Sequence, residues 1–525
     1  MKYSFIPTTQ HCTLIPFDYS PEIDYSFLNI TYKPDTFQLQ SFELLQNNED
    51  ILVTAHTSCG KTLVAEYCIH LQLKNNHKVI YTTPLKTLSN QKYYYFSKIF
   101  DTGIITGDIS LNTNASLLIM TTEIFHSRIE EMDCSYVIFD EVHYINDRER
   151  GYVWEESLIK YKGNILCLSA TIDNKKEFSD WLGRQRNKHC YVISTKERVI
   201  PLEYMIYYEN KGYNLNGEIN LKYFSEKEQF KHKIIKKNKK DELVTNYFKI
   251  TKEKRTNVYS LVNWLKEKEL IPSILFTFSR SKIDKLSDSL HIDLTTDNEK
   301  SLIKEFLNKV NLPPLPQVSK VKEMLLRGIA IHYSTMIPLL KESVEFLISF
   351  GLVKVLFATE TFAVGVNMPA KSVVFLNLTK ITKENGSNQF RYLNSSEFTQ
   401  MSGRAGRRGL DSKGVVILTD VERKDTLSLF KSSSLIVSQF KVTFNFVLRN
   451  DPSFLRKTFL ENESDKRNRR ILQILSTENI SVKNNKYFTK MKELIQIDYS
   501  YFIKENDIIY TKSNHKKRES FLWSI

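Results

Sequence analysis

A loop at residues 55–62 carries side chains that suit phosphate binding. It follows the apolar run ILVTA (51–55) and precedes a helical pattern. The loop consists of Ala55, His56, Thr57, Ser58, Cys59, Gly60, Lys61 and Thr62. In this setting, backbone N–H groups and the helix N-terminus bind phosphate oxygens. Lys61 would reach the β- and γ-phosphates of a nucleotide and the Thr62 hydroxyl would bind Mg²⁺, although the usual pattern opens with glycine instead of Ala55.

Two adjacent carboxylates follow a second apolar run, VIF (137–139). Asp140 would hold Mg²⁺ through water, and Glu141 would orient and deprotonate an attacking water. By themselves, two acids at the end of a strand are more typical of a solvated surface than of a catalytic site. Together with the loop at 55–62, they indicate hydrolysis of a nucleoside triphosphate.

A stretch rich in glycine and arginine, QMSGRAGRRG (400–409), lies far along the chain. Phosphoryl transfer needs cations where negative charge develops. Arg404 and Arg407 are three residues apart on a predicted helix, so both can face one cleft. A basic helix facing solvent is the alternative, and the glycines disfavour it because they form helices poorly. If the first half of the chain binds the nucleotide and these arginines complete its site, closure of the two domains would be coupled to hydrolysis, as in a translocating motor.

The elements that must position these residues follow an α/β rhythm. Apolar strands alternate with helical stretches from residue 51 to about 200 and again from 273 to 420, with an irregular connection across 203–270. The pattern predicts two parallel sheets covered on both faces by helices, with ligands at the carboxyl ends of the strands. We divide the chain into an N-terminal extension plus ATP-binding domain (1–200), a second α/β domain (201–435) and a short C-terminal module (436–525).

Composition constrains the partners. The net charge of +14 and the sequence pI of about 9.1 favour a polyanionic partner without identifying it. No apolar stretch reaches the length that spans a bilayer, and residues 1–20 lack the apolar core of a signal peptide. The six cysteines include no C-x-x-C pair, which predicts free thiols in a reducing compartment and neither zinc nor a disulfide framework.

The ordered motifs resemble those of superfamily-two helicases, whose phosphate-binding loop opens with alanine, so Ala55 is expected. The resemblance is strongest to the superkiller-like branch of DExH-box RNA helicases and covers about residues 37 to 450. The stretches that carry it are AHTSCGKT (55–62), YTTPLKTLSNQK (81–92), LIMTTEIFHS (118–127), VIFDEVHYIND (137–147), RERGYVWEE (148–156), LSAT (168–171), RGIAIHYS (327–334), VLFATETFAVGVNMPA (355–370) and QMSGRAGRRGLD (400–411). Within the branch, GIITGDISLN (103–112) and YVISTKERVIPLE (191–203) look more similar to the cytoplasmic superkiller helicase than to its nuclear relative.

The resemblance implies two tandem RecA-like domains followed by a short module similar to a winged helix. Phe37 would stack on adenine, and Gly365 and Asn367 would lie near the ribose. Ser169 and Thr171 would link the nucleotide state to the second domain. The γ-phosphate or the attacking water would be contacted by Gln400, Arg404 and Arg407. The residues that would line a nucleic-acid strand through its phosphates are Pro84, Lys86, Thr121, Thr122, Thr277, Thr359 and Thr361.

Three features depart from the family pattern. Glu43 stands where a glutamine is usual, so the two-sided amide contact with adenine is lost unless the acid is protonated. Thr335 replaces a usual glycine, and the sequence assigns no consequence to the change. The chain stops at residue 525, so we expect residues 436–525 to hold only a shortened module in place of a full winged helix, helical bundle and arch.

The resemblance implies an RNA helicase that uses ATP and Mg²⁺ to translocate 3′→5′ on single-stranded RNA or on a duplex with a 3′ overhang. It also implies RNA decay with the exosome and superkiller-complex proteins, in the cytoplasm or the nucleus, with a monomer as the catalytic unit and no membrane partner. One alternative is a DNA helicase of the related repair group, because phosphate contacts do not read the 2′-hydroxyl. Another is a nucleotide-gated RNA clamp or assembly subunit with little unwinding.

Overall fold

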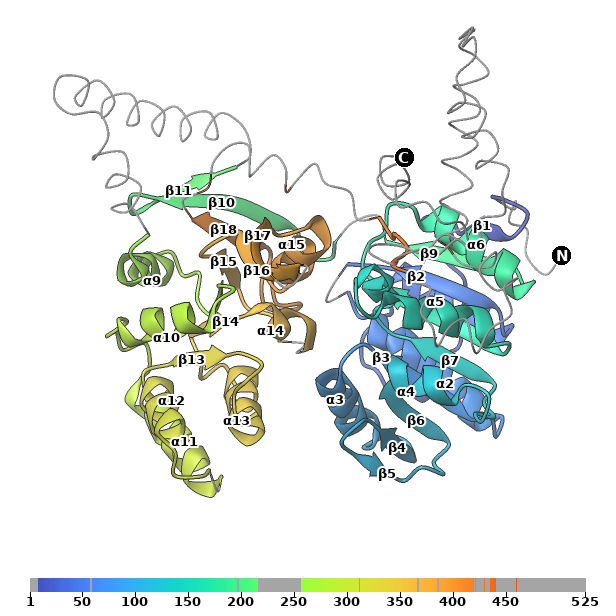
Figure 1. The fold of residues 1–525 in the computed structure, drawn as a ribbon, viewed down its shortest axis with the longest axis horizontal. Helices are drawn as coiled ribbons and strands as arrows, with labels where there is room; N and C mark the ends of the chain where they lie inside the picture. Colours follow the sequence, from blue (N-terminus) through green and yellow to red (C-terminus); the bar gives the residue numbers. More distant parts are fainter. Residues whose placement is uncertain are drawn as a thin grey trace, which may run out of the picture.

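The protein forms two α/β lobes, which lie side by side in Figure 1. The computed structural model describes residues 8–56, 59–195, 198–215, 256–310, 312–365, 368–384 and 387–419, together with residues 421, 429, 435–440 and 459. The sheet of the first lobe ends with the strand Cys190–Ser194, and the sheet of the second begins with the strand Leu202–Tyr208. The phosphate-binding loop and the arginine-rich stretch therefore lie in different lobes.

Nine strands form the first sheet in the described part of the chain, in the order β1-β9-β2-β8-β7-β3-β6-β4-β5. All neighbours are parallel except β4 and β5, which are antiparallel. The strands are β1 (Cys12–Leu14), β2 (Asp50–Thr54), β3 (Val79–Thr83), β4 (Thr102–Ile105), β5 (Ser110–Leu111), β6 (Leu117–Thr121), β7 (Tyr136–Phe139), β8 (Asn164–Ser169) and β9 (Cys190–Ser194). A parallel sheet buried on both faces needs apolar residues along the whole of each strand, which explains the continuous apolar runs.

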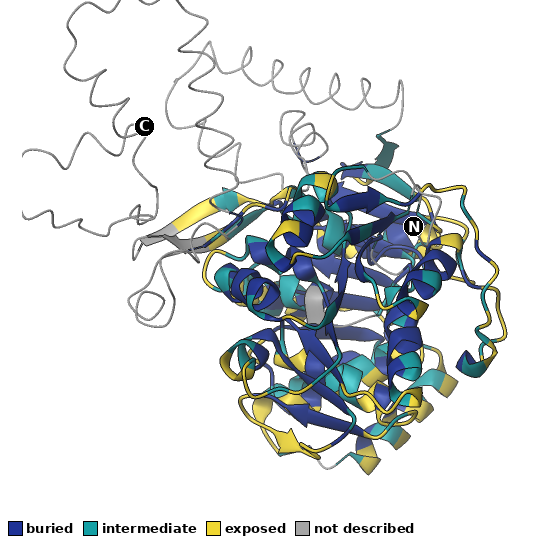
Figure 2. Ribbon diagram, turned by 90° about the vertical axis from the view of Figure 1, so that its right-hand side faces the viewer, coloured by how far each residue is buried: buried dark blue, intermediate teal, exposed yellow. Residues whose placement is uncertain are grey.

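Each face of the first sheet has its own hydrophobic core, because successive side chains of a strand point to opposite faces. On β2, Ile51 and Val53 belong to one cluster and Leu52 to the other. The first face is covered by α1 (Thr36–Gln46), α2 (Lys61–Lys74) and α3 (Lys86–Phe96), and the second by α4 (Thr122–Arg128), α5 (Gly151–Lys160) and α6 (Lys175–Arg186). Figure 2 shows this arrangement as dark buried strands between helices whose outer faces are exposed.

The second sheet is also parallel, apart from β11 at its edge. Its order in the described residues is β11-β10-β18-β15-β12-β14-β13. The strands are β10 (Leu202–Tyr208), β11 (Lys211–Asn214), β12 (Ser273–Phe276), β13 (Ile329–His332), β14 (Val355–Ala358), β15 (Ser372–Phe375) and β18 (Gly414–Thr419). An antiparallel hairpin, β16 (Thr379–Glu384) and β17 (Ser387–Tyr392), stands outside the sheet.

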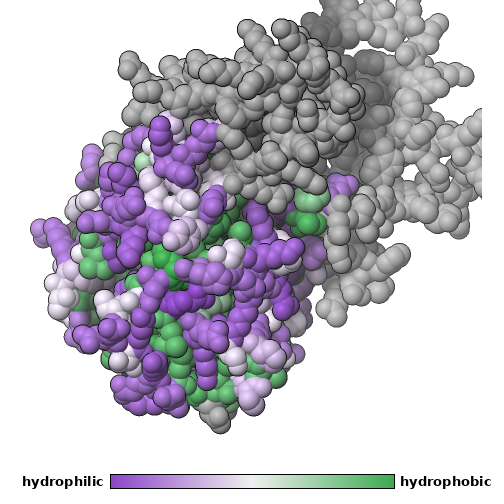
Figure 3. Space-filling view, turned by 90° about the vertical axis from the view of Figure 1, so that its left-hand side faces the viewer, coloured by the Kyte–Doolittle hydropathy of each residue, from purple (hydrophilic) through white to green (hydrophobic). Residues whose placement is uncertain are grey.

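Helices cover the second sheet and share one hydrophobic core with it. They are α9 (Val258–Glu267), α10 (Arg280–Asp288), α11 (Asp297–Lys309), α12 (Pro316–Leu326), α13 (Pro338–Ser349), α14 (Glu360–Gly365) and α15 (Ser395–Ser402). The outer face of this lobe is mainly hydrophilic with scattered apolar side chains (Figure 3). None of the helices in the described ranges has the length and apolarity needed to cross a bilayer.

The predicted α/β class with tandem RecA-like parallel sheets is confirmed, but several elements differ from the prediction. Residues 203–270 are not irregular throughout, since β10 and β11 occupy 202–214 and α9 occupies 258–267. The short strand β1 and the hairpin β16–β17 also lie outside the predicted pattern, because each has too few apolar residues to mark it. The predicted C-terminal module, 436–525, falls almost wholly outside the described residues.

Contacts join parts of the chain that are distant in sequence. The segment 435–440 lies against the first lobe, where Asn146 and Asn174 donate side-chain amides to the carbonyls of Leu435 and Ile436 at 2.7 and 2.8 Å. Between the lobes, the Arg408 guanidinium forms an ion pair of 3.0 Å with Asp35, the residue that precedes α1. The arginine-rich stretch is therefore held beside the first lobe.

Candidate active site

The phosphate-binding loop joins β2 to α2 at the carboxyl end of the strand. Gly60 has a φ of +86°, a backbone conformation that favours glycine, and a Cβ there would come within 2.8 Å of the Gln38 side-chain amide. Lys61 donates to the carbonyls of Ala55 and His56 at 2.8 and 3.2 Å. The ammonium therefore points into the loop. Thr57 and Ser58, also predicted for this site, lie outside the described residues, and Cys59 is buried.

Thr62 and Asp140, the predicted metal ligands, face a common point that is occupied by Lys92. The Lys92 ammonium donates to the Thr62 hydroxyl at 2.8 Å and lies 3.8 Å from the Asp140 carboxylate. The Tyr81 hydroxyl donates to the same carboxylate oxygen at 2.6 Å. Burial raises the pKa of Asp140, and the charge of Lys92 opposes this effect. Three separate elements, α2, α3 and β7, thus meet at one cluster of oxygens around a cation.

Glu141 lies next to Asp140 in a left-handed backbone conformation with a φ of +55°. Such a conformation is costly for a residue with a side chain, and strained residues of this kind are enriched at functional sites. Its carboxylate lies 3.4 Å from His143 Nδ1. Burial alone would raise the pKa of Glu141, but His143, Lys61 and Arg404 outweigh this effect and lower it. Glu141 is therefore ionised at neutral pH, the form that can accept a proton.

His143 connects the carboxylates to β8, which carries the predicted coupling residue Ser169. His143 Nδ1 lies 3.4 Å from the Ser169 hydroxyl, and the imidazole is buried. The pKa of His143 is lowered, chiefly by burial. Thr171, the second predicted coupling residue, lines a small cavity with His143 and with Thr399 of α15. The geometry thus brings Ser169 and Thr171 to the region where the two lobes meet.

Arg404 faces this cluster from the second lobe. Its guanidinium is buried and donates to the Ala363 carbonyl in α14, at 2.9 Å from Nε. Burial lowers the pKa of Arg404 to about 10, and attraction to Glu141 opposes the decrease. The predicted helix through Arg404 and Arg407 is wrong, because α15 ends at Ser402 and Gly406 has a φ of +88°. The two arginines consequently have different environments.

Arg407 is held by its own lobe, while Gln400 stays on the helix. The Arg407 guanidinium forms a two-pronged ion pair with Asp411, at 2.8 and 2.9 Å, which raises its pKa. Gln400 is half-buried near the end of α15. Of the three side chains predicted to contact the γ-phosphate, Arg404 is the one whose charge acts on Glu141. The other two stay predictions.

The residues predicted to contact the adenine base and the ribose of the nucleotide have different positions in the structure. Phe37 is 5% exposed and packs in the core beneath α1. Glu43, the departure from the usual glutamine, accepts a hydrogen bond of 2.8 Å from Tyr19, and burial together with this contact raises the pKa of Tyr19 to about 12. Gly365 ends α14, and Asn367 lies outside the described residues. The roles of these residues in nucleotide binding stay predictions.

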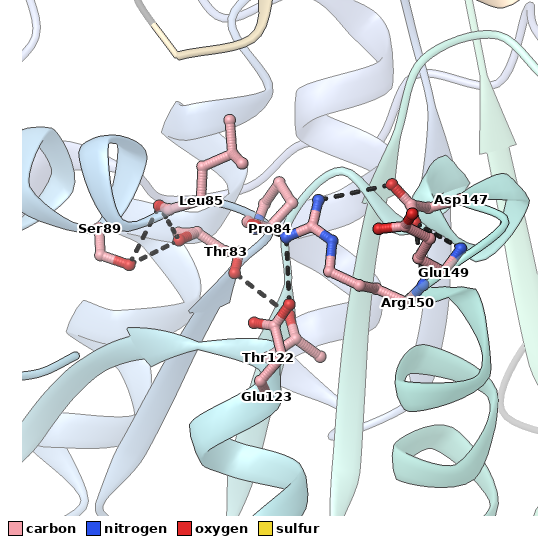
Figure 4. A network of polar contacts seen from close by, with 9 residues as sticks. All are labelled: Thr83, Pro84, Leu85, Ser89, Thr122, Glu123, Asp147, Glu149 and Arg150. Carbon is pink, nitrogen blue, oxygen red and sulfur yellow. Dashed lines mark hydrogen bonds and ion pairs between the residues drawn. The ribbon is translucent and has the colours of Figure 1, made fainter. Parts of the chain in front are cut away.

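Two of the predicted strand-binding residues of the first lobe, Pro84 and Thr122, lie near Arg150, as Figure 4 shows. The Arg150 guanidinium donates to the Pro84 carbonyl and to Glu123, each at 3.2 Å. Thr122 is buried and donates to the Thr83 carbonyl at 3.3 Å. Arg150 therefore ties the loop at 84–86 to the start of α4.

The other residues that are predicted to contact a nucleic-acid strand differ in how far they are exposed. Lys86 has a side chain that is 51% exposed and pairs with Asp108 at 2.8 Å, whereas Thr121 is buried. In the second lobe, Thr359 and Thr361 share a hydrogen bond of 2.9 Å. Thr277 is buried and donates to the Asn377 side chain at 2.9 Å. Any contact of Thr277 with a strand would therefore need its hydroxyl to leave Asn377.

Thr335 gains a consequence in the structure that the sequence does not assign. Its hydroxyl accepts a hydrogen bond of 3.1 Å from Arg280, at the start of α10. The same guanidinium lies 5.0 Å from the centre of the Tyr333 ring. A glycine at position 335 would remove this hydroxyl and leave Arg280 held by the ring and by Asp284.

Four residues that contact the candidate site were not singled out from the sequence, namely Lys92, His143, Arg150 and Arg198. All lie within stretches that carry the family resemblance, so their positions, although not their contacts, had a signal. Arg198 joins the lobes, because it donates to the Gly403 and Ala405 carbonyls and its charge acts on His56. It thus links the phosphate-binding loop to the arginine-rich stretch.

Residues 35–178, which form most of the first lobe, match the model of the DEAD/DEAH box helicase family. Among known proteins, the chain is 42% identical to human Superkiller complex protein 2 over 449 residues, which is 79% of this chain and 36% of that protein. It is 39% identical to human Exosome RNA helicase MTR4 over 458 residues, covering 81% of this chain and 43% of the relative.

The Antiviral helicase SKI2 of Saccharomyces cerevisiae is 37% identical over 494 residues, covering 79% of this chain and 38% of that protein. The predicted resemblance to the superkiller-like DExH-box helicases is confirmed by these similarities. The chain spans about two fifths of the length of these relatives.

Proposed function

We propose that this protein is an RNA helicase that hydrolyses ATP to translocate 3′→5′ on RNA and unwind it. One observation carries the proposal. Lys61 and Arg404, from opposite lobes, both act electrostatically on Glu141, which lies beside Asp140 at the carboxyl end of β7. A phosphate-binding lysine, a general base and an arginine from a second lobe are the parts that phosphoryl transfer to water requires. The relatives named as RNA helicases support RNA as the nucleic acid.

Each part of the site has a proposed task. The loop at 55–62 and Lys61 hold the phosphates of ATP, as the positive φ of Gly60 and the start of α2 favour. Glu141 accepts a proton from the attacking water. Arg404 offsets the negative charge that develops on the γ-phosphoryl group, and Gln400 and Arg407 complete this contact when the lobes close. Phe37, Gly365 and Asn367 are our proposed contacts for the base and ribose.

The donor set fits Mg²⁺. The ion prefers oxygen ligands, and the Thr62 hydroxyl and Asp140 carboxylate already face one cation, the Lys92 ammonium. Thr62 and Asp140 would hold the ion. When bound, Mg²⁺ neutralises charge on the β- and γ-phosphate oxygens. Ser169 and Thr171 would report the state of the site to the second lobe, because both lie close to His143.

The proposed RNA path crosses both lobes at the carboxyl ends of their strands. It uses the residues Pro84, Lys86, Thr121, Thr122, Thr277, Thr359 and Thr361. A net charge of +14 favours such a polyanion. Since two relatives are named for a superkiller complex and for the exosome, we propose that this chain acts with comparable partners in RNA decay. The proposed compartment is the cytoplasm, with the nucleus as the alternative, and the proposed catalytic unit is a monomer.

Steady-state ATP hydrolysis by the purified chain, with and without single-stranded RNA, tests the proposal. We expect RNA to stimulate hydrolysis and Glu141→Gln to abolish the stimulated rate. Displacement of a labelled strand from duplexes with 3′ or 5′ overhangs then tests the direction. Hydrolysis that RNA does not change, with no strand displacement, would favour a nucleotide-gated clamp instead. Equal stimulation by a DNA strand of the same sequence would favour a DNA helicase.

A further inference from the structure

Lys92 is placed where the proposed metal site needs its ligands to be free. It lies on the second turn of α3, and its side chain is 13% exposed. Its ammonium donates to the Thr62 hydroxyl at 2.8 Å, lies 3.8 Å from Asp140 and stands 5.4 Å from the centre of the Tyr81 ring. The hydroxyl oxygen that would bind Mg²⁺ therefore already accepts a hydrogen bond from a positive charge.

The surroundings of Asp140 explain why a cation is held there. The Asp140 side chain is 8% exposed, and a buried carboxylate without a counter-charge is destabilising. Lys61, the other nearby lysine, donates to the carbonyls of Ala55 and His56. Within the described residues, Lys92 is the one cation that forms an ion pair with Asp140. Lys92 thus provides the counter-charge for this carboxylate.

A lysine is also suited to leave. Its ammonium sits on a flexible four-carbon stem, so it can withdraw without moving α3. The distance of 3.8 Å to Asp140 is that of a long ion pair and exceeds hydrogen-bond length, so the contact with Thr62 is its one direct bond here. Two cations at this point would repel each other strongly, because the site is largely screened from water.

We propose that Lys92 competes with Mg²⁺ for the oxygens of Thr62 and Asp140, so that metal binding requires Lys92 to withdraw. This inference rests on the proposed nucleotide site. Lys92 then has two effects of opposite sign: it stabilises the protein when no metal is bound, and it raises the Mg²⁺ concentration needed to load the site. It acts by occupying the metal ligands and is not itself one of them.

The test compares Lys92→Met, which removes the charge and keeps most of the length of the side chain, with the wild-type chain. The first readout is the Mg²⁺ concentration that gives half-maximal binding of fluorescent N-methylanthraniloyl-ADP. We expect it to fall about three- to tenfold in Lys92→Met and to stay near the wild-type value in Lys92→Arg. The second readout is the thermal unfolding midpoint in EDTA, which we expect to fall by about 2–4 °C in Lys92→Met. Lys98→Met, an exposed lysine just beyond α3, is the matched control.

The other outcomes overturn the proposal in distinct ways. A higher Mg²⁺ requirement in Lys92→Met would mean that Lys92 helps to arrange the metal ligands and does not compete with the ion. No change in either readout would mean that Lys92 neither competes with the ion nor stabilises the site. Failure of the wild-type chain to bind the nucleotide at saturating Mg²⁺ would contradict the proposed function itself, which separates that failure from the failure of this inference.

Discussion

The strand ends of the first sheet and the arginine-rich stretch of the second lobe handle charge in different ways. In the first lobe, Thr62, Lys92 and Asp140 come from separate elements and face one another across a single point. In the second lobe, Arg404 and Arg407 are bonded to neighbours in their own lobe, the Ala363 carbonyl and Asp411. The first lobe is therefore arranged for a ligand by itself, and the second contributes through its position relative to the first.

Arg404→Ala tests the second half of this comparison and has the largest expected effect. ATP turnover should fall by about 10³-fold or more, because charge on the γ-phosphoryl group would lose its cation from the second lobe. Nucleotide affinity should change little, since the phosphate-binding loop lies in the first lobe. Turnover and nucleotide binding, measured on the same samples, separate these effects. A fall in RNA affinity alone would show instead that Arg404 contacts the strand. Circular dichroism checks that the variant is folded.

Glu141→Gln tests the first half of the comparison, the arrangement of the site in the first lobe. We expect hydrolysis to fall by about 10²–10⁴-fold, because the amide cannot accept the proton of the attacking water. ATP binding should be retained, and RNA should stay bound for longer in the presence of ATP. Rapid-quench hydrolysis and RNA dissociation rates measure both effects. Glu130→Gln, an exposed acid near α4, serves as the control. Equally fast hydrolysis by Glu141→Gln would remove Glu141 from its assigned task.

Asp411→Asn sharpens the comparison inside the second lobe. The substitution removes the carboxylate charge that holds Arg407 at 2.8 and 2.9 Å. If Arg407 must leave Asp411 to reach the γ-phosphate, turnover should rise, by about two- to tenfold, the range of an ion pair worth about 0.4–1.4 kcal/mol. A decrease in turnover would show that Asp411 holds Arg407 in its working position. Steady-state ATP hydrolysis at saturating RNA distinguishes the two.

His332→Gln probes the second sheet by pH and has the smallest expected effect. Burial lowers the pKa of His332 on β13, although Glu345, at 2.7 Å, favours the charged imidazolium and Lys341 opposes it. The folded protein thus favours the neutral ring, and this contribution is present above the unfolded pKa of about 6.5 and is lost as the pH falls. The slope from one histidine is at most about 1.4 kcal/mol per pH unit. Unfolding midpoints between pH 5 and 7 should depend less on pH in the variant.

The sequence predicts the first lobe's site more completely than the second's. A loop between a strand and a helix and two acids after an apolar run have local signals, and the positions of Lys61 and Asp140 follow from them. The contact between Lys92 and Thr62 has no such signal, because it joins residues on two helices whose packing depends on the whole sheet. The hydrogen bond between Tyr19 and Glu43 likewise has no local signal, because it depends on how distant segments pack together.

The arginine-rich stretch shows why a local rule fails. Arg404 and Arg407 have helical spacing, but Gly406 takes a positive φ and Ala405 forms an isolated bridge with Ala370 of the second lobe. The chain therefore turns away from the axis of α15 before Arg407. Whether a glycine ends a helix depends on the segment that packs against it. Here that segment includes Ala370, which is more than thirty residues away in the sequence.

The ion pair between Arg408 and Asp35 has a further consequence for the contact between the two lobes. Both side chains are partly exposed, at 40% and 29%, so the pair contributes at most about 1 kcal/mol and weakens as salt rises. An ion pair of this strength breaks easily, so it does not lock the two lobes together. A higher salt concentration should accordingly shorten the time for which the lobes stay in contact, and a lower one should lengthen it.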